Sequence, residues 1–194
     1  MKRDILNSLN EAQEALENFI ENENAISSIE SAATVLIEAF SNSCSVYSFG
    51  NGGSMSDAIH FAEELSGRFR GDRKALPATA ISDVGHLTCV SNDFGYEDVF
   101  SRYLEAHLKK GDVVLGISTS GNSANVIKAC EVAKNIGATV ITLTGKNNSK
   151  LADISDIDIV AIGGKFADRV QELHIKIIHI LIELIERKLF PENY

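Results

Sequence analysis

The chain has 194 residues and a formal net charge of −9, from 18 lysines and arginines against 27 aspartates and glutamates. This length suffices for one sizeable core, so we expect a single domain over residues 1–194. The acidic balance and the lack of a basic run argue against a nucleic-acid partner. No apolar segment approaches the roughly 20 residues that a bilayer span requires, which argues against a membrane protein.

Three cysteines, Cys44, Cys89 and Cys130, are scattered along the chain without metal-type spacing. Their odd number and their spacing predict small buried thiols in a reducing compartment, not disulfides or metal ligands. The N-terminal stretch is amphipathic and acidic and lacks the apolar core of a signal peptide. We therefore expect a cytoplasmic protein.

Apolar residues recur at helical spacing from Ile5 to Ile20 and again from Ile26 to Phe40, which predicts two N-terminal helices within 1–40. Strands and helices alternate after them. The patterns predict strands at 45–49, 78–81, 113–117, 139–143 and 157–162, and helices at 54–65, 100–109 and 123–136. Such alternation is typical of a mainly parallel five-stranded sheet with helices on both faces. The expected fold is a three-layer α/β/α sandwich with its core at 45–162.

A last helix is predicted at 166–189, and apolar residues surround it on nearly every side. A helix of this kind is buried on all sides. Because a small chain encloses such a helix with difficulty, we expect it to pack against copies of itself or of the N-terminal helices in an oligomer. Three polar residues, Gln171, His174 and His179, lie inside this apolar helix, and their presence there needs an explanation.

Two loops place glycines and small hydroxyl residues between an apolar strand and the following helix. They are Gly-Asn-Gly-Gly-Ser at 50–54 and Ser-Thr-Ser-Gly-Asn-Ser at 118–123. A helix N-terminus offers unpaired N–H donors and the positive end of its dipole, and hydroxyls add adjustable donors. Both loops fall at the carboxyl edge of the sheet, where parallel sheets bind ligands. The pattern predicts a phosphorylated substrate.

His60 and Glu64 stand four residues apart on the helix that follows the first loop, so both side chains share one face near the expected ligand. Such a pair on a surface helix is more often merely solvated, and its position behind an anion-binding loop favours function. The segment 92–95, Asn-Asp-Phe-Gly, fits a plain turn and a lining of the ligand crevice equally well.

Spacing on the last helix does not choose between its two histidines. At about 100° per residue, Gln171 and His179 lie within about 80° of each other, whereas His174 and His179 are about 140° apart. Both histidines cannot easily face one site. For either one alone, a satisfied core or interface histidine is the commoner role.

Several segments together resemble the sugar isomerase (SIS) domain family and, within it, the phosphoheptose isomerases. The resemblance covers nearly the whole chain and rests on GNGGS at 50–54, HFAEELSGR at 60–68, SNDFGY at 91–96, GISTSGNSANV at 116–126 and DRVQELHIKIIHILI at 168–182. It implies a flavodoxin-like α/β/α sandwich, a homotetramer with active sites between subunits, and a bound zinc ion. The implied reaction converts D-sedoheptulose 7-phosphate to D-glycero-D-manno-heptose 7-phosphate through an ene-diol, the first step toward activated heptose for lipopolysaccharide core or other surface glycans.

The resemblance also implies roles for individual residues. Glu64 and His179 match the family's acid/base pair, which favours His179 over His174. The implied zinc ligands are His60, Glu64, Gln171 and His179. The residues that match substrate contacts are Asn51, Gly52, Gly53, Ser54, Asn92, Asp93, Ser118, Thr119, Ser120, Ser123 and Gln171.

Two other functions stay open at this point. Non-catalytic SIS proteins sense sugar phosphates or associate with a replication initiator, and they tend to lack the carboxylate and histidine that this chain carries as Glu64 and His179. An isomerase of another phosphosugar, such as a hexulose or arabinose phosphate, is the second. Similarity to the heptose group over the full length, including the last helix, argues against it.

Overall fold

The computed structural model describes every residue from Met1 to Tyr194. Its five strands form one sheet in the order β2-β1-β3-β4-β5, and all neighbouring pairs are parallel. The strands are β1 (Val46–Gly50), β2 (Ala78–Ala80), β3 (Val113–Ser118), β4 (Thr139–Thr144) and β5 (Ile157–Val160). All five expected strands are confirmed, with only small differences at their ends.

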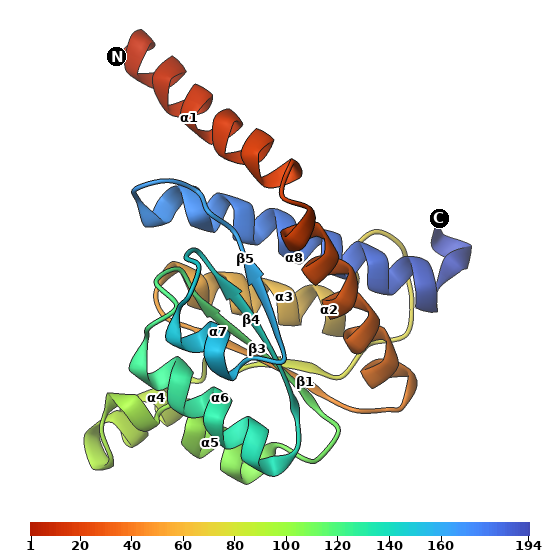
Figure 1. Cartoon of the computed structure of the whole chain (residues 1–194). Helices are drawn as coiled ribbons and strands as arrows, with labels where there is room; N and C mark the ends of the chain where they lie inside the picture. The colour runs from red at the N-terminus through yellow and green to blue at the C-terminus, as the bar shows by residue number, and fades with distance from the viewer.

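Helices cover both faces of the sheet, which confirms the three-layer sandwich (Figure 1). One face carries α2 (Glu23–Ser41), α3 (Gly53–Ser66) and α8 (Ala167–Leu189), and α1 (Lys2–Ile20) precedes them. The other face carries α4 (Val84–Asp93), α5 (Ser101–His107), α6 (Ala124–Ile136) and α7 (Lys150–Ile154). Two 3-10 turns, η1 (Tyr96–Asp98) and η2 (Pro191–Asn193), complete the chain.

Sequence patterns did not predict α4 and α7. The α4 segment is rich in β-branched and short polar residues, and only Val90 in it is buried, so it lacks the apolar periodicity that marks a helix. The α7 segment has five residues, of which only Leu151 is buried. Asn92 and Asp93, whose segment fits a plain turn and a lining of the ligand crevice equally well by sequence, are the last residues of α4.

The core lies on both sides of the sheet because alternate strand residues point to opposite faces. On β3, Leu115 and Ile117 join the apolar cluster beneath α2, α3 and α8, whereas Val114 joins the cluster beneath α4 to α7. The sheet is thereby fixed between the two helical layers. Its carboxyl edge carries the loops that lead into α3 and α6.

The last helix is buried along the face that packs on the sheet, where Leu173, Ile177 and Leu181 are inaccessible to solvent or nearly so. Ile180 faces away and is 42% exposed. In Figure 1, α1 extends away from the body of the molecule, and its Ile5 and Leu9 are exposed. Burial of these apolar side chains by other subunits stays a prediction.

The cysteine prediction is correct for Cys130, which is buried, and wrong for Cys89, which is exposed on α4. Cys44 is half-buried, and all three thiols are free. None of the helices combines the length and apolar character that a membrane crossing needs.

Candidate functional site

The two glycine- and hydroxyl-rich loops meet at the carboxyl edge of the sheet. They follow β1 and β3, which are neighbours at the point where the strand order reverses, the usual ligand crevice of such sheets. Asn51 in the first loop and Asn125 at the start of α6 exchange two hydrogen bonds of 2.9 Å each. Tyr96 donates a third hydrogen bond to Asn51 Oδ1, at 2.8 Å. This network ties the first loop to the start of α6, which follows the second loop.

Hydroxyl groups of the second loop converge above the N-terminus of α6. Ser118 Oγ lies 2.9 Å from Ser123 Oγ and 3.4 Å from Ser120 Oγ. Gly121 turns the loop with φ of +64°, and a Cβ at this position would lie 2.3 Å from Ser149 Cβ, so only glycine fits. Ser123 is the N-cap residue of α6 but makes no capping hydrogen bond. Its hydroxyl contacts only Ser118, so a ligand at the helix N-terminus can still bind to it.

A pocket of about 470 Å³ opens beside this loop. The residues that line it include Thr119, Ser120, Lys146 and Lys165. The chain as a whole is acidic, so two lysines at a hydroxyl-lined hollow give this region a positive charge suited to an anion.

Gln171 reaches the first loop from α8. Its amide lies against Gly53, the first residue of α3, so closely that a Cβ on Gly53 would stand 2.5 Å from Gln171 Nε2. Eight residues of helix separate Gln171 from His179, about 12 Å along the axis. The structure therefore places Gln171 at the loop end of the site, and its predicted place among the metal ligands stays a prediction.

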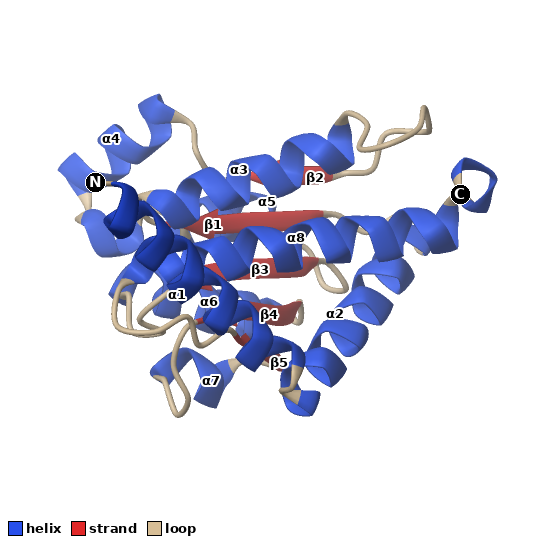
Figure 2. Cartoon of the chain, turned by 90° about the horizontal axis from the view of Figure 1, so that it is seen from above, coloured by secondary structure: helices blue, strands red, loops and turns tan.

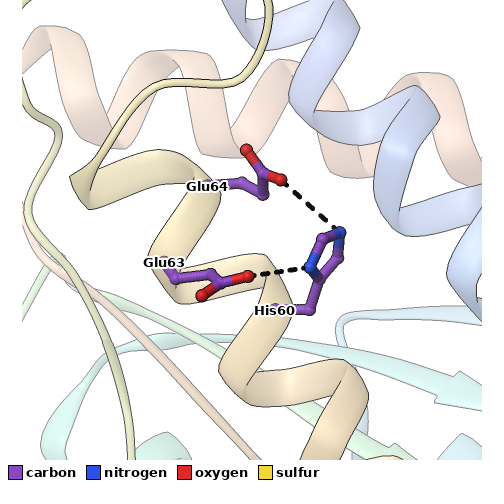
Figure 3. A group of neighbouring side chains, drawn as sticks. All are labelled: His60, Glu63 and Glu64. Atoms are coloured by element: carbon purple, nitrogen blue, oxygen red, sulfur yellow. Dashed lines mark hydrogen bonds and ion pairs between the residues drawn. The ribbon is translucent and has the colours of Figure 1, made fainter.

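His60, Glu64 and His179 form a cluster between α3 and α8, as their predicted shared function requires. His60 Nε2 lies 2.9 Å from His179 Nε2 and 3.8 Å from Glu64 Oε1. On the other side of the ring, His60 Nδ1 lies 3.0 Å from Glu63 Oε1. Figure 3 shows the two carboxylates approaching the same imidazole from different sides. The side chains of His60 and Glu64 are 29% and 22% exposed, so the cluster is accessible to a ligand.

The donors around His60 Nε2 fit a zinc ion. Two imidazole nitrogens and a carboxylate are typical zinc ligands, and nitrogens on a tetrahedral zinc stand about 3.3 Å apart, close to the 2.9 Å between the two Nε2 atoms. Glu63 meets the opposite ring nitrogen, so it orients His60 and leaves the Nε2 lone pair for a metal. Ligand atoms of His60, Glu63 and Glu64 lie within 4.8 Å of one another.

Partial burial lowers the pKa of His179, and the neighbouring His60 imidazole lowers it further, while Glu64 acts in the opposite direction. Because the ordinary value is 6.5, His179 is neutral at pH 7 and has a lone pair to offer. The ring of Phe69 packs 5.7 Å from the ring of His179, centre to centre. This imidazole can therefore accept a proton or bind a metal.

Three residues at the site were missed by sequence reasoning. Residues 53, 57, 60 and 64 share one face of α3 at helical spacing. Helix α3 lies beside α8 (Figure 2), where Gly53 meets Gln171 and His60 meets His179. Asp57 on it is half-buried, its Oδ2 has no hydrogen-bond partner, and burial raises its pKa to about 6. Glu63 and Tyr96 are the other two site residues that sequence reasoning missed. The spacing of Asp57 and Glu63 from His60 was a usable signal, whereas the Tyr96 contact depends on tertiary structure.

Asn92 and Asp93 are placed apart from the cluster, at the exposed end of α4. Asn92 Nδ2 donates to Asp93 Oδ1 at 2.8 Å, and Asp93 Oδ2 accepts from Cys89 at 3.6 Å. These bonds stay within α4 and leave both side chains accessible. Their role in binding substrate stays a prediction.

His174 is the core histidine of the pair on α8. It is fully buried, and its Nε2 lies 3.2 Å from the carbonyl of Thr144 while Nδ1 has no partner. Burial lowers its pKa to about 4 from the ordinary 6.5. Between these values the unfolded chain binds a proton that the folded protein excludes, so stability falls as pH falls.

His174→Leu should therefore make the protein more acid-resistant. The Thr144 carbonyl also accepts from the Ala161 N–H at 2.7 Å and stays paired. From pH 7 to pH 4, the unfolding free energy of the variant should gain about 3 kcal/mol relative to wild type. Urea denaturation of both proteins at the two pH values measures this difference, and Asp57 contributes equally to both. A difference that does not change with pH would contradict the assignment.

The comparisons with known proteins agree with the fold. A family model described as SIS domain matches residues 9–145. The phosphoheptose isomerase of Enterobacter sp. (strain 638) is 57% identical, covering 95% of this chain and 96% of the relative. The solved phosphoheptose isomerase of Neisseria gonorrhoeae is 35% identical with a TM-score of 0.81, covering 95% and 96% of the two chains. That of Francisella tularensis is 30% identical with a TM-score of 0.90, covering 96% and 99%.

Proposed function

The chain belongs to the phosphoheptose isomerases of the SIS-domain family, and from this premise we propose that it converts D-sedoheptulose 7-phosphate to D-glycero-D-manno-heptose 7-phosphate. The observation that carries the proposal has two parts: the cluster of His60, Glu64 and His179 between α3 and α8, and the hydroxyl-lined loop at the N-terminus of α6. The first part offers groups that move protons, and the second offers an anion site. An aldose–ketose isomerase of a sugar phosphate needs both.

The loop at 118–123 would hold the phosphate group. Backbone N–H donors at the start of α6 and the hydroxyls of Ser118, Ser120 and Ser123 would surround its oxygens. Anchoring this end of the sugar brings C1 and C2 to the proton-transferring groups, which removes much of the entropic cost of reaction. Asn51, Gly52, Gly53 and Ser54, with Gln171 against them, would bind the middle of the sugar.

Isomerisation moves one proton between C1 and C2 and another between their oxygens, through an ene-diol. Glu64 would take the carbon-bound proton from one carbon and return it to the other. The neutral imidazole of His179 would carry the proton between the oxygens. A carboxylate is a weak base toward carbon acids, so the substrate carbonyl must be polarised at the same moment.

We propose one zinc ion per subunit, held by His60, Glu64 and His179, with Gln171 as a fourth ligand whose amide would have to leave Gly53 and turn toward His179. When bound, zinc would polarise the carbonyl oxygen as a Lewis acid. Glu63 would keep His60 in the required tautomer through Nδ1. Because a metal-bound carboxylate is a poorer base, Glu64 would need to loosen from the metal when substrate binds, or the metal would be partly structural.

The proposed assembly is a homotetramer of single-domain chains with sites between subunits, in the cytoplasm. Apolar side chains exposed on α1 and α8, among them Ile5, Leu9 and Ile180, support it. Arg169 at the start of α8 ties α1 to the body through Ser8 and Glu11. The N-terminal helices would contribute to packing between subunits.

Ser120→Ala should raise KM about tenfold and leave kcat within about twofold, because it removes one donor to a charged phosphate group far from the reacting carbons. Initial rates over a range of substrate concentrations give both constants. Ser31→Ala is the matched control, since Ser31 is exposed on α2 and bonds only to its own helix. A fall in kcat with unchanged KM would place Ser120 at the reacting carbons instead.

The substrate assignment is tested by comparing kcat/KM for sedoheptulose 7-phosphate, a hexulose 6-phosphate and a pentulose 5-phosphate. We expect the seven-carbon sugar to exceed the others by at least about a hundredfold, since well-placed polar groups discriminate strongly. A preference for a shorter sugar would overturn the substrate. Tight binding without turnover of any of them would favour a phosphosugar sensor, the second candidate.

A further inference from the structure

A fully buried ion pair lies beyond the end of α3. Arg73, in the loop between α3 and β2, donates from Nε to Glu186 Oε1 of α8 at 2.6 Å, and neither side chain is exposed. Burying two charges is costly unless the remaining donors and acceptors are also satisfied. Here the remaining donors of Arg73 and the second oxygen of Glu186 all have hydrogen-bond partners, and one of these partners is the backbone of Glu64.

Arg73 binds the carbonyl groups that end α3. Its Nη2 donates to the carbonyl of Glu64 at 2.7 Å, and its Nη1 donates to that of Leu65 at 2.8 Å and that of Gly67 at 3.2 Å. The last carbonyls of a helix have no partner within the helix. The guanidinium supplies one, and it does so at the backbone of Glu64 itself.

Residues 190–194 close over the same pair. Tyr194 donates its hydroxyl hydrogen to Glu186 Oε2 at 2.9 Å. Asn193 Nδ2 donates to the carbonyl of Asp72, next to Arg73, at 3.2 Å. We refer to Arg73, Glu186 and Tyr194 as the clasp. It joins the loop after α3, the end of α8 and the segment that follows α8.

The loop held by the clasp also contacts the other catalytic group. Phe69 in this loop packs its ring 5.7 Å from the His179 ring. Arg70, the next residue, pairs with Glu183 of α8 at 2.8 Å. The loop therefore contacts the backbone carbonyl of Glu64 through Arg73 and the imidazole ring of His179 through Phe69.

We propose that the clasp is a positioning device for the isomerase site: by fixing the end of α3 and the loop after it against α8, it sets Glu64 and His179 at the separation that proton transfer requires. This inference rests on the proposed function, which assigns those two residues their roles. Displacing a reacting group by about 1 Å can cost a hundredfold in rate. The clasp residues touch neither substrate nor the reacting atoms, so they act through Glu64 and His179.

Arg73→Lys separates positioning from simple charge pairing. Lysine keeps the positive charge beside Glu186. Its single ammonium group, however, cannot bind Glu186 and the carbonyl of Glu64 at once, as the forked guanidinium does. We expect kcat to fall about tenfold and KM to stay within about twofold, because the substrate-binding loops are untouched. Unchanged kcat in the folded variant would overturn the proposal.

Tyr194→Phe tests the segment after α8 with a smaller change, should the lysine variant not fold. It removes only the hydroxyl bond to Glu186, and we expect kcat to fall about threefold. The double variant should lose less than the product of the two single effects, since both act through one network. Tyr47→Phe is the matched control: it removes a single hydroxyl bond, 3.4 Å to the carbonyl of His107, and should leave kcat unchanged. Equal kcat in Tyr194→Phe and wild type would overturn the proposal.

A second readout does not depend on catalysis. The chain has 5 histidines, so their imidazole NMR signals are few and can be assigned by substitution. The His179 signal should shift in Arg73→Lys and Tyr194→Phe but not in Tyr47→Phe. If the wild-type protein does not isomerise sugar phosphates, the proposed function fails, while this shift still decides whether the clasp positions His179. An unmoved signal in both clasp variants would overturn the clasp alone.

Discussion

Glu64→Gln should lower kcat by about a thousandfold or more, because an amide cannot take the proton that general-base catalysis moves. The fold should be unaffected, since Glu64 is partly exposed and contacts His60 at 3.8 Å without a buried partner. Rates measured by NMR, together with a thermal melting curve, separate loss of chemistry from loss of structure. Turnover at the wild-type rate would remove Glu64 from the mechanism.

Glu63→Gln is the control for this experiment. Glu63 is the neighbouring carboxylate on α3, it is more exposed than Glu64, and it also contacts His60, at Nδ1. Because it only orients the ring, its loss should cost about tenfold. If kcat falls more in Glu63→Gln than in Glu64→Gln, Glu63 is the general base and Glu64 orients His60.

His179→Gln should also lower kcat by about a thousandfold, since it removes the neutral imidazole proposed to carry a proton between the substrate oxygens. It should also weaken zinc binding, measured by competition with a chromogenic chelator, because His179 Nε2 faces His60 Nε2 at 2.9 Å. His174→Leu is the comparison on the same helix. Its kcat should stay near that of wild type, and a large loss there would show that the two histidines were assigned wrongly.

The sheet and most helices could be predicted because their signals are local. Apolar strands that alternate with amphipathic helices specify a parallel sheet, and α3 carries His60 and Glu64 at a spacing that is visible in sequence. The α4 helix was missed because it packs through little more than Val90. The Asp83 cap at its start is a local signal, but without an apolar stripe behind it that signal does not distinguish a helix from a turn.

The site could be predicted only in part, because it joins α3 to a helix more than a hundred residues away. Spacing on α8 does not distinguish His174 from His179. Tertiary packing does: α8 packs on the sheet, where His174 is buried beside the carbonyl of Thr144, and on α3, where His179 meets His60. The same packing seats Gln171 on Gly53. The clasp lay beyond sequence analysis for the same reason: Arg73 and Glu186 are 113 positions apart.

We would first follow purified protein and sedoheptulose 7-phosphate by NMR, with and without a chelator, and after zinc is restored. We expect heptose 7-phosphate as product, its loss on chelation and its return with zinc. Product formed at the same rate in the presence of chelator would keep Glu64 and His179 and remove the metal. If the folded, zinc-restored protein gives no product, this chain is a phosphoheptose isomerase in family but not in activity.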